Sequence, residues 1–371
     1  MENYVVSARK YRPTSFETVV GQKSITTTLR NAIKQNKLAH AYLFCGPRGV
    51  GKTTIARILA KTINCTNPTE SIEACNECDS CRSFNEGRSF NVYELDAASN
   101  NSVEDIRNLI EKVQIPPQIG KYKVYIIDEV HMLSSAAFNA FLKTLEEPPS
   151  HAIFILATTE KHKILPTILS RCQIYDFSRV SITDTINHLE TVAKLEGITI
   201  DRDSLNVIAK QADGGMRDAL SIFDQVVSCC GNNINYKSVI ENLNVLDKEY
   251  YFQLVDHFLE GNVTESLLIF DKILQKGFEG QHFITGLSNH FRDLAVSIDP
   301  QTLQLLDSSE DVKKMYQEQS KRCEALFIYQ ALKICNDCDM AYRQSKNKRL
   351  LIELTLIRLS QLKDSKKKYS N

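Results

Sequence analysis

Apolar and polar residues form two different patterns along the first half of the chain. Four short, nearly continuous apolar runs are typical of strands, and they occupy residues 41–45, 92–95, 123–128 and 153–158. After the first run, Ile55, Ile58, Leu59 and Ile63 recur at the spacing of one helix face, which predicts a helix over residues 52–63. Apolar strands separated by helices predict a parallel sheet with helices on both faces.

The strand pattern ends near residue 181, and helical periodicity follows it. Residues 182–243 predict several short amphipathic helices, and residues 247–364 predict longer ones such as 263–275 and 323–343. We therefore expect an α/β domain, two helical domains and a polar tail. Their predicted boundaries are 1–180, 181–243, 244–365 and 366–371.

Composition and charge narrow the possible functions. Of 371 residues, 43% are hydrophobic and 24% are charged, as in ordinary globular proteins. The 45 Lys and Arg residues balance 45 Asp and Glu residues, so any contact with nucleic acid must come from a local patch. The first residues lack an apolar signal region, and no run reaches the ~18 apolar residues of a membrane span. A cytoplasmic protein without secretory disulfides is therefore expected, despite 11 cysteines.

Residues 46–53 match the phosphate-binding pattern G-x-x-x-x-G-K-[ST]. The glycines let backbone N–H groups turn inward around phosphates, and the next helix presents its positive end to them. Lys52 is expected to reach the β and γ phosphates of ATP, and the Thr53 hydroxyl to ligate Mg²⁺. The strand before and the helix after favour this reading over a chance glycine turn. The candidate nucleotide ligands are Gly46, Pro47, Arg48, Gly49, Val50, Gly51, Lys52, Thr53 and Thr54.

Acidic and hydroxyl residues end two of the predicted strands. Asp128 and Glu129 end the third strand; Asp128 is expected to hold Mg²⁺ directly or through water, and Glu129 to polarise the attacking water. The alternative is a solvated strand end. Thr158 and Thr159 end the fourth strand, where a hydroxyl can hold that water and sense the γ-phosphate. Two threonines that merely favour a strand end are equally compatible with the pattern.

Two arginines are candidates for a role in phosphoryl transfer. Arg171 follows the fourth strand in Ser-Arg-Cys, and Arg217 lies at an expected helix start after Gly214-Gly215. An arginine placed on the transferring phosphoryl group accelerates such reactions by ~10³–10⁵-fold. Taken alone, each of them is more often a surface ion pair.

Four cysteines within residues 65–81 have the spacing C-x9-C-x2-C-x2-C, which suits a tetrahedral structural Zn²⁺ ion. They are Cys65, Cys75, Cys78 and Cys81. Four thiolates leave no open position for catalysis, and the alternative is unliganded loop cysteines. Cys335 and Cys338 share a C-x2-C spacing without a second pair, so they are expected to be plain helix residues.

Together these motifs closely resemble the gamma/tau family of bacterial DNA polymerase III clamp-loader subunits, in the AAA+ superfamily. The resemblance covers residues 4 to about 245. Besides the phosphate loop and the cysteines, it rests on Arg9–Pro13, Val19–Gln22, His40–Phe44, Glu94–Ser99, Asp128–Leu133, Leu142–Pro149 and Leu169–Cys172.

The resemblance implies roles for individual residues. It places Tyr11, Arg12, Pro13 and Val20 around the adenine and ribose. It likens Thr158 to the first sensor, Arg217 to the second, and Arg171 to an arginine finger acting on ATP held by the neighbouring subunit. The implied cofactors are ATP, Mg²⁺ and a structural Zn²⁺.

The resemblance also implies partners and a cellular role. The second domain, residues 181–243, should be a small helical lid. The third domain should form a collar that joins five subunits, among them delta, delta-prime and further copies of this chain. ATP binding and hydrolysis would load a sliding clamp onto primer–template DNA, within the DNA polymerase III holoenzyme and near the nucleoid. The chain is expected to be either a naturally short, gamma-type form or a shortened piece of the long form, so the polymerase and helicase contacts of the long form are not transferred.

Two rival functions remain open from the sequence. The first is a hexameric AAA+ helicase or branch-migration motor, against which the cysteine insertion and the Ser-Arg-Cys motif argue. The second is a non-hydrolysing scaffold like the delta-prime subunit, which lacks a working phosphate loop. The presence of Lys52, Thr53, Asp128 and Glu129 argues against that scaffold.

Overall fold

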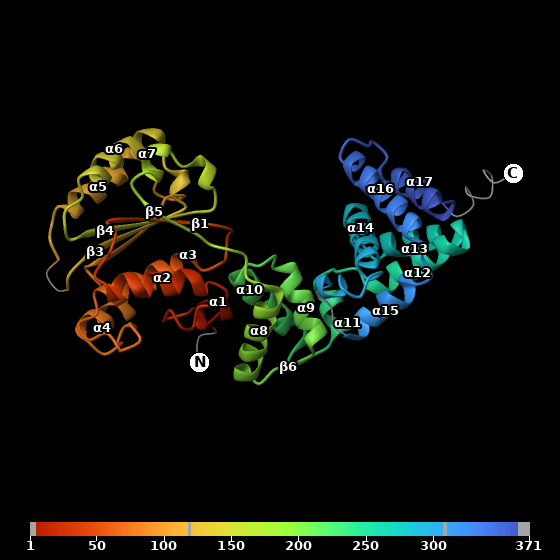
Figure 1. Cartoon of the computed structure of the whole chain (residues 1–371), viewed down its shortest axis with the longest axis horizontal. Helices are drawn as coiled ribbons and strands as arrows, with labels where there is room; N and C mark the ends of the chain where they lie inside the picture. Colours follow the sequence, from red (N-terminus) through yellow and green to blue (C-terminus); the bar gives the residue numbers. More distant parts are fainter. Residues whose placement is uncertain (1–4, 118–119, 307–309, 363–371) are drawn as a thin grey trace. The chain divides into compact units, whose positions relative to one another are not determined.

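The computed structural model describes residues 5–117, 120–306 and 310–362, which form two compact units (Figure 1). The first unit is Met1–Ile198 with Ile208–Ser228, and the second is Thr199–Val207 with Cys229–Asn371. None of the helices in the described ranges is long and apolar enough to cross a membrane. The expected polar tail at 366–371 lies outside the described residues.

A five-stranded parallel sheet forms the centre of the first unit, in the order β2-β3-β4-β1-β5. Its strands are β1 (Ala41–Cys45), β2 (Val92–Asp96), β3 (Lys123–Asp128), β4 (Ala152–Thr158) and β5 (Gln173–Asp176). The four predicted strands are confirmed. Strand β5 was not predicted from the sequence, because this short edge strand buries only Tyr175 among its four residues. Since all five strands are parallel, their carboxyl ends share one edge of the sheet.

Helices cover both faces of this sheet, as the apolar strands predicted (Figure 1). Ile106 of α5 and Phe141 of α6 pack on one face, whereas Ile55 and Leu59 of α3 pack on the other. The helices and 3₁₀ turns before the lid are α1 (Ser7–Lys10), α2 (Lys23–Lys34), α3 (Lys52–Ile63), α4 (Asp79–Asn85), α5 (Val103–Val113), η1 (Val130–Met132), α6 (Ser135–Glu146), η2 (Lys161–Lys163) and α7 (Pro166–Leu169).

The lid region begins with α8 (Ile182–Glu196) and continues through α9 (Arg202–Gln211) and α10 (Met216–Cys230). The predicted break at Gly214-Gly215 lies between α9 and α10 and is confirmed. Short strands that the sequence analysis did not predict, β6 (Thr199–Ile200) and β7 (Asn233–Ile234), pair in parallel within the second unit.

The rest of the second unit is helical and has its own core. Its elements are α11 (Tyr236–Asn242), α12 (Lys248–Glu260), α13 (Val263–Gln275), α14 (Gly280–Val296), η3 (Leu303–Leu305), α15 (Glu310–Ser320), α16 (Ala325–Tyr342) and α17 (Lys348–Ser360). Aromatic residues such as Phe258, Phe283 and Phe291 fill this core. Cys335 and Cys338 are buried in it on α16, which confirms that they are ordinary helix residues.

Candidate functional site

The candidate site lies at the edge of the sheet where β1, β3 and β4 end. The loop between β1 and α3 starts at Gly46, whose N–H donates to the Thr158 carbonyl at 3.2 Å. Gly46 has a φ of +147°, and a Cβ added there would lie 2.5 Å from the carbonyl oxygen of Phe177. Only glycine therefore fits this position, which sets the direction in which the loop leaves β1.

Lys52 is the first residue of α3 and is nearly buried, with 6% of its surface exposed. Its Nζ donates to the carbonyl oxygens of Gly46 at 2.8 Å and Pro47 at 2.7 Å. Burial lowers the pKa of Lys52, while the nearby carboxylates of Glu129 and Asp128 raise it in part. A charged donor held against neutral carbonyls is well placed to exchange them for phosphate oxygens.

Thr53 and Asp128 meet although 75 residues separate them in the chain. The Thr53 hydroxyl donates to Asp128 Oδ2 at 2.6 Å. Two adjacent ligands of an octahedral Mg²⁺ ion, each at about 2.1 Å from it, lie about 3 Å apart. The pair therefore fits a magnesium ion with a small outward movement, and both oxygens are of the type that Mg²⁺ prefers.

Glu129 has a left-handed backbone, with a φ of 47°, where the chain turns out of β3. Its Oε2 accepts hydrogen bonds from the Thr159 hydroxyl at 3.0 Å and from the Thr159 N–H at 3.3 Å. A non-glycine residue in this conformation is uncommon and occurs often at functional sites. Thr159 thus holds the carboxylate to which the sequence analysis assigned the attacking water.

His131 is a further residue of the site, and the sequence analysis gave it no role of its own. Its side chain is 6% exposed and lies with Nδ1 3.4 Å from Glu129 Oε2 and Nε2 3.4 Å from Glu160 Oε1. Nδ1 also lies 3.1 Å from the hydroxyl of Thr158, which accepts from the Glu160 N–H at 3.0 Å. The imidazole therefore joins the ends of β3 and β4. The signal in the sequence that could have identified His131 as a site residue is its position two residues after Glu129.

The N-terminal segment approaches the same loop. Arg12 Nε donates to the Thr54 hydroxyl at 3.1 Å, and burial is the main cause that lowers the pKa of Arg12. Tyr11 donates its hydroxyl to Glu196 Oε1 of α8 at 2.6 Å. Pro13 and Val20 are half-buried. The segment that the resemblance placed around adenine thus contacts both α3 and the lid.

Of the two arginines, only Arg217 lies at the phosphate loop. It begins α10 with Met216, and its N–H donates to the Gly49 carbonyl at 3.3 Å. Arg171 instead precedes β5 at the amino edge of the sheet, where it pairs with Glu146 at 2.7 Å. The five-residue strand β1 spans about 16 Å between the two edges. Arg171 therefore does not reach the loop of its own chain.

The four-cysteine module, residues 65–81, packs beside α3. The Sγ atoms of its four cysteines all lie within 4.8 Å of one another. Thiolates at 2.3 Å from a tetrahedral Zn²⁺ ion lie about 3.8 Å apart, so the cluster fits this ion. Burial raises the pKa of Cys78, but hydrogen bonds from Thr66 and Cys81 together outweigh it and lower this pKa to about 6. Burial raises the pKa of Cys81.

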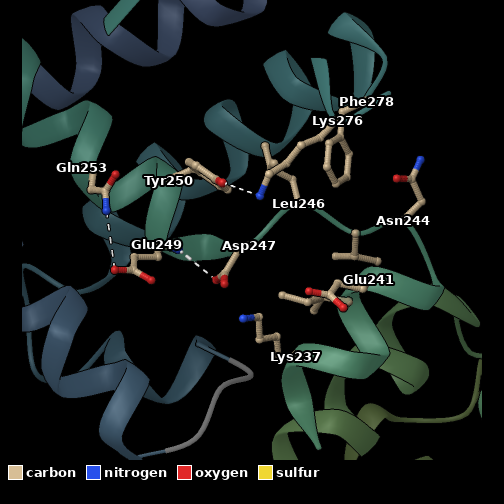
Figure 2. A pocket seen from close by; sticks show the side chains of 12 residues that line it. Lys237, Glu241, Asn244, Leu246, Asp247, Glu249, Tyr250, Gln253, Lys276 and Phe278 are labelled. Carbon is tan, nitrogen blue, oxygen red and sulfur yellow. Dashed lines mark hydrogen bonds between the residues drawn. The ribbon is translucent and has the colours of Figure 1, made fainter. Parts of the chain in front are cut away.

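A separate hollow lies within the second unit and has a volume of about 560 Å³ (Figure 2). Its charged groups are largely matched: Lys276 Nζ donates to the Tyr250 hydroxyl at 2.7 Å, and Asp247 caps α12 by accepting from the Glu249 N–H at 3.2 Å (Figure 2). In Figure 2, Lys237 points toward Asp247 across the lining, whereas Glu241 lies one turn further along the same helix, α11. This mixture of charges does not select phosphate, unlike the loop at Lys52.

Three family models match consecutive parts of the chain. One described as the delta subunit of DNA polymerase III matches residues 21–181. One described as the ATPase lid domain of the DNA polymerase III clamp loader subunit matches residues 185–232. One described as domain III of the gamma and tau subunits matches residues 234–370.

Curated relatives extend this similarity over most of the chain. The chain is 41% identical over 360 residues to the DNA polymerase III subunit tau of Bacillus subtilis, covering 97% of this chain and 64% of that protein. It is 40% identical to the subunit gamma of Buchnera aphidicola from Schizaphis graminum, covering 79% of this chain and 81% of that one. The chain thus spans less than two thirds of the B. subtilis relative.

Similarity to solved structures is weaker. The Thermotoga maritima RuvB Holliday junction branch migration motor is 20% identical with a TM-score of 0.48, covering 67% of this chain and 80% of that one. The fold class expected from the sequence, a parallel α/β sheet with a cysteine insertion followed by lid and helical domains, is confirmed by the topology, the cysteine cluster and the family models.

Proposed function

Because this chain belongs to the gamma/tau family of DNA polymerase III clamp-loader subunits, we propose that it hydrolyses ATP to help load a sliding clamp onto primed DNA. The observation that carries the proposal is the 2.6 Å contact between Thr53 and Asp128. It brings the phosphate loop and the acidic end of β3 to one point, as a magnesium nucleotide requires. Lys52 and Glu129 flank this contact.

Each side chain of the site then has a role in binding or hydrolysing ATP. Residues 46–54 hold the phosphates, and Lys52 moves from the carbonyls of the loop to the β and γ oxygens. Thr53 and Asp128 hold Mg²⁺, which would neutralise charge that develops on the phosphates. Glu129 orients and polarises the attacking water once it leaves Thr159.

The borders of the nucleotide site are formed by the N-terminal segment and the lid. Tyr11, Arg12, Pro13 and Val20 border the adenine and ribose, which the Arg12–Thr54 contact supports. Thr158 senses the γ-phosphate from the end of β4. Arg217 approaches the phosphates from α10, whose first turn already contacts Gly49.

Arg171 acts on the ATP of a neighbouring subunit. Its place at the opposite edge of the sheet supports this role, since one edge of each subunit can then face the phosphate loop of the next. Its guanidinium must exchange Glu146 for the phosphate. Assembly with delta, delta-prime and further copies of this chain would complete each site, and primer–template DNA would trigger hydrolysis.

The domain scheme is proposed in three parts. An ATPase domain at 1–180 carries the four-cysteine module with a structural Zn²⁺ ion, a lid follows at 181–243, and a collar at 244–365 joins the subunits. The family models support these boundaries because they meet near residues 183 and 233. We place the protein in the cytoplasm, at the nucleoid.

The trans role of Arg171 is tested by Arg171→Ala in a reconstituted loader. We expect DNA-stimulated ATP turnover to fall about 10³-fold, the lower range for such arginines, while binding of a fluorescent ATP analogue stays unchanged. Arg88→Ala is the matched control, because Arg88 also forms a surface pair, with Glu86 at 3.6 Å. Unchanged turnover in Arg171→Ala would refute the role of this residue.

The same assay separates the rival functions. A chain that binds the analogue but shows no turnover with any partner would be a scaffold. Displacement of a labelled strand from a DNA duplex, without any requirement for the clamp, would identify a helicase instead.

A further inference from the structure

The four-cysteine module contains a buried carboxylate that the proposed function does not use. Glu73 is 8% exposed, and its two oxygens accept hydrogen bonds from the backbone N–H groups of Phe16 at 3.0 Å and Glu17 at 3.1 Å. These bonds join segments 57 and 56 residues apart in the chain. A buried carboxylate needs such donors, and the buried N–H of Phe16 would lack a partner without it.

Glu73 lies in a turn two residues before Cys75. Glu73 ends a tight turn in which the Thr69 N–H donates to the Glu73 carbonyl at 2.9 Å, and the Glu73 N–H donates to the Thr69 hydroxyl at 3.1 Å. Ile72 within the turn has a φ of 61°, which is strained for a β-branched residue. Two residues later, the Cys75 N–H lies 3.3 Å from the Sγ of Cys65. The turn that carries Glu73 is therefore joined to the cysteine cluster through Cys75.

The segment that Glu73 holds belongs to the nucleotide site. Phe16 is 1% exposed and packs in the same core as Ile55 and Leu59 of α3. Four residues earlier, Arg12 donates to Thr54 at 3.1 Å, next to the phosphate loop. Residues 12–17 thus run from the loop to Glu73 and lie outside helices and strands, so their position depends on these few contacts.

The module is also anchored on the nucleotide-binding helix itself. Lys61 Nζ donates to the side chain of Asn76 in the module. The guanidinium of Arg57 lies 5.1 Å from the ring of Phe84, which is in α4 three residues after Cys81. Both basic residues belong to α3, which starts at Lys52. The module therefore forms a bridge between the distal half of α3 and residues 16–17.

We propose that the four-cysteine module, when it holds its metal ion, positions the N-terminal nucleotide-bordering segment through Glu73 and so strengthens ATP binding. Glu73 is a positioning residue, since it acts through the backbone of Phe16 and Glu17. The inference rests on the proposed function for the location of the nucleotide. It adds that loss of the metal weakens nucleotide affinity, although the cysteines do not border the nucleotide.

The test compares Glu73→Gln with Glu70→Gln in the intact chain. Glutamine keeps one accepting oxygen and turns an NH₂ group toward a backbone donor, whereas Glu70 is exposed in the same turn and serves as the control. We measure the dissociation constant of a fluorescent ATP analogue with Mg²⁺, and bound zinc by mass spectrometry. We expect the constant to rise about tenfold in Glu73→Gln and to stay within twofold in Glu70→Gln.

A second measurement needs no variant and therefore does not depend on how a variant folds. Zinc is removed from the wild-type chain with a chelator, and hydrogen exchange of the Phe16 and Glu17 amides is followed together with nucleotide affinity. Faster exchange with weaker binding supports the coupling. Unchanged exchange and affinity after zinc removal, or an unchanged constant in Glu73→Gln, overturns it. If the untreated wild-type chain binds no analogue, the proposed function fails as well.

Discussion

Buried His290 in α14 makes the stability of the second unit depend on pH. The side chain is 2% exposed, with Nδ1 3.1 Å from the Tyr316 hydroxyl and Nε2 3.0 Å from Gln319 Oε1. Neutral imidazole satisfies both, accepting from Tyr316 and donating to Gln319. Burial lowers the pKa of His290 to about 3, and Lys248 contributes to the same direction.

The size of this loss of stability follows from the difference between the pKa of His290 in the folded protein and in the unfolded protein. An unfolded histidine has a pKa near 6.5, so between about pH 6.5 and 3 only the unfolded chain takes up this proton. Stability from neutral His290 is fully present above pH 6.5 and is lost as the pH falls toward 3. The loss is 1.36 kcal/mol for each pH unit below 6.5, which is about 1.5 units at pH 5. Going from pH 7 to pH 5 therefore lowers the free energy of unfolding by about 2 kcal/mol.

Urea unfolding of the intact chain at pH 7 and pH 5, followed by circular dichroism, measures this loss. We expect His290→Gln to be less stable at pH 7 but to lose about 2 kcal/mol less than the wild type on acidification. His282→Gln is the matched control, because His282 is an exposed residue of the same helix. If the wild type and His290→Gln lose stability equally between the two pH values, His290 is not held neutral by burial.

Two further predictions concern the nucleotide site. His131→Ala removes the side chain between the carboxylates of Glu129 and Glu160, so we expect kcat for ATP to fall about tenfold with nucleotide affinity unchanged; an equal change in both would show that His131 supports binding instead. Gly46→Ala places a Cβ 2.5 Å from a backbone oxygen, so calorimetry should show at least ~100-fold weaker ATP binding, whereas Gly87→Ala, also at positive φ but with open space, should bind normally.

Local patterns in the sequence were enough to predict several features of this protein. The apolar runs predicted four of the five strands of the main sheet, because each buried strand carries its own signal. Ser102 and Asp105 have the three-residue spacing of a capping box, and the structure shows this box with bonds of 3.1 and 3.2 Å at the start of α5. The phosphate-loop pattern and the cysteine spacing are likewise short-range, so they needed no knowledge of the fold.

Only the tertiary structure decided which distant segments meet. Strand order and the edge strand β5 depend on pairing between segments whose patterns carry no information about each other. The sequence assigned Thr53 and Asp128 to one Mg²⁺ ion, and the structure adds their direct contact at 2.6 Å. The contacts of His131 with two carboxylates and of Glu73 with the backbone of Phe16 could not be predicted for the same reason. The position of Arg171 at the sheet edge opposite its own phosphate loop also follows only from parallel pairing, because the chain direction of every strand then decides which residues share an edge.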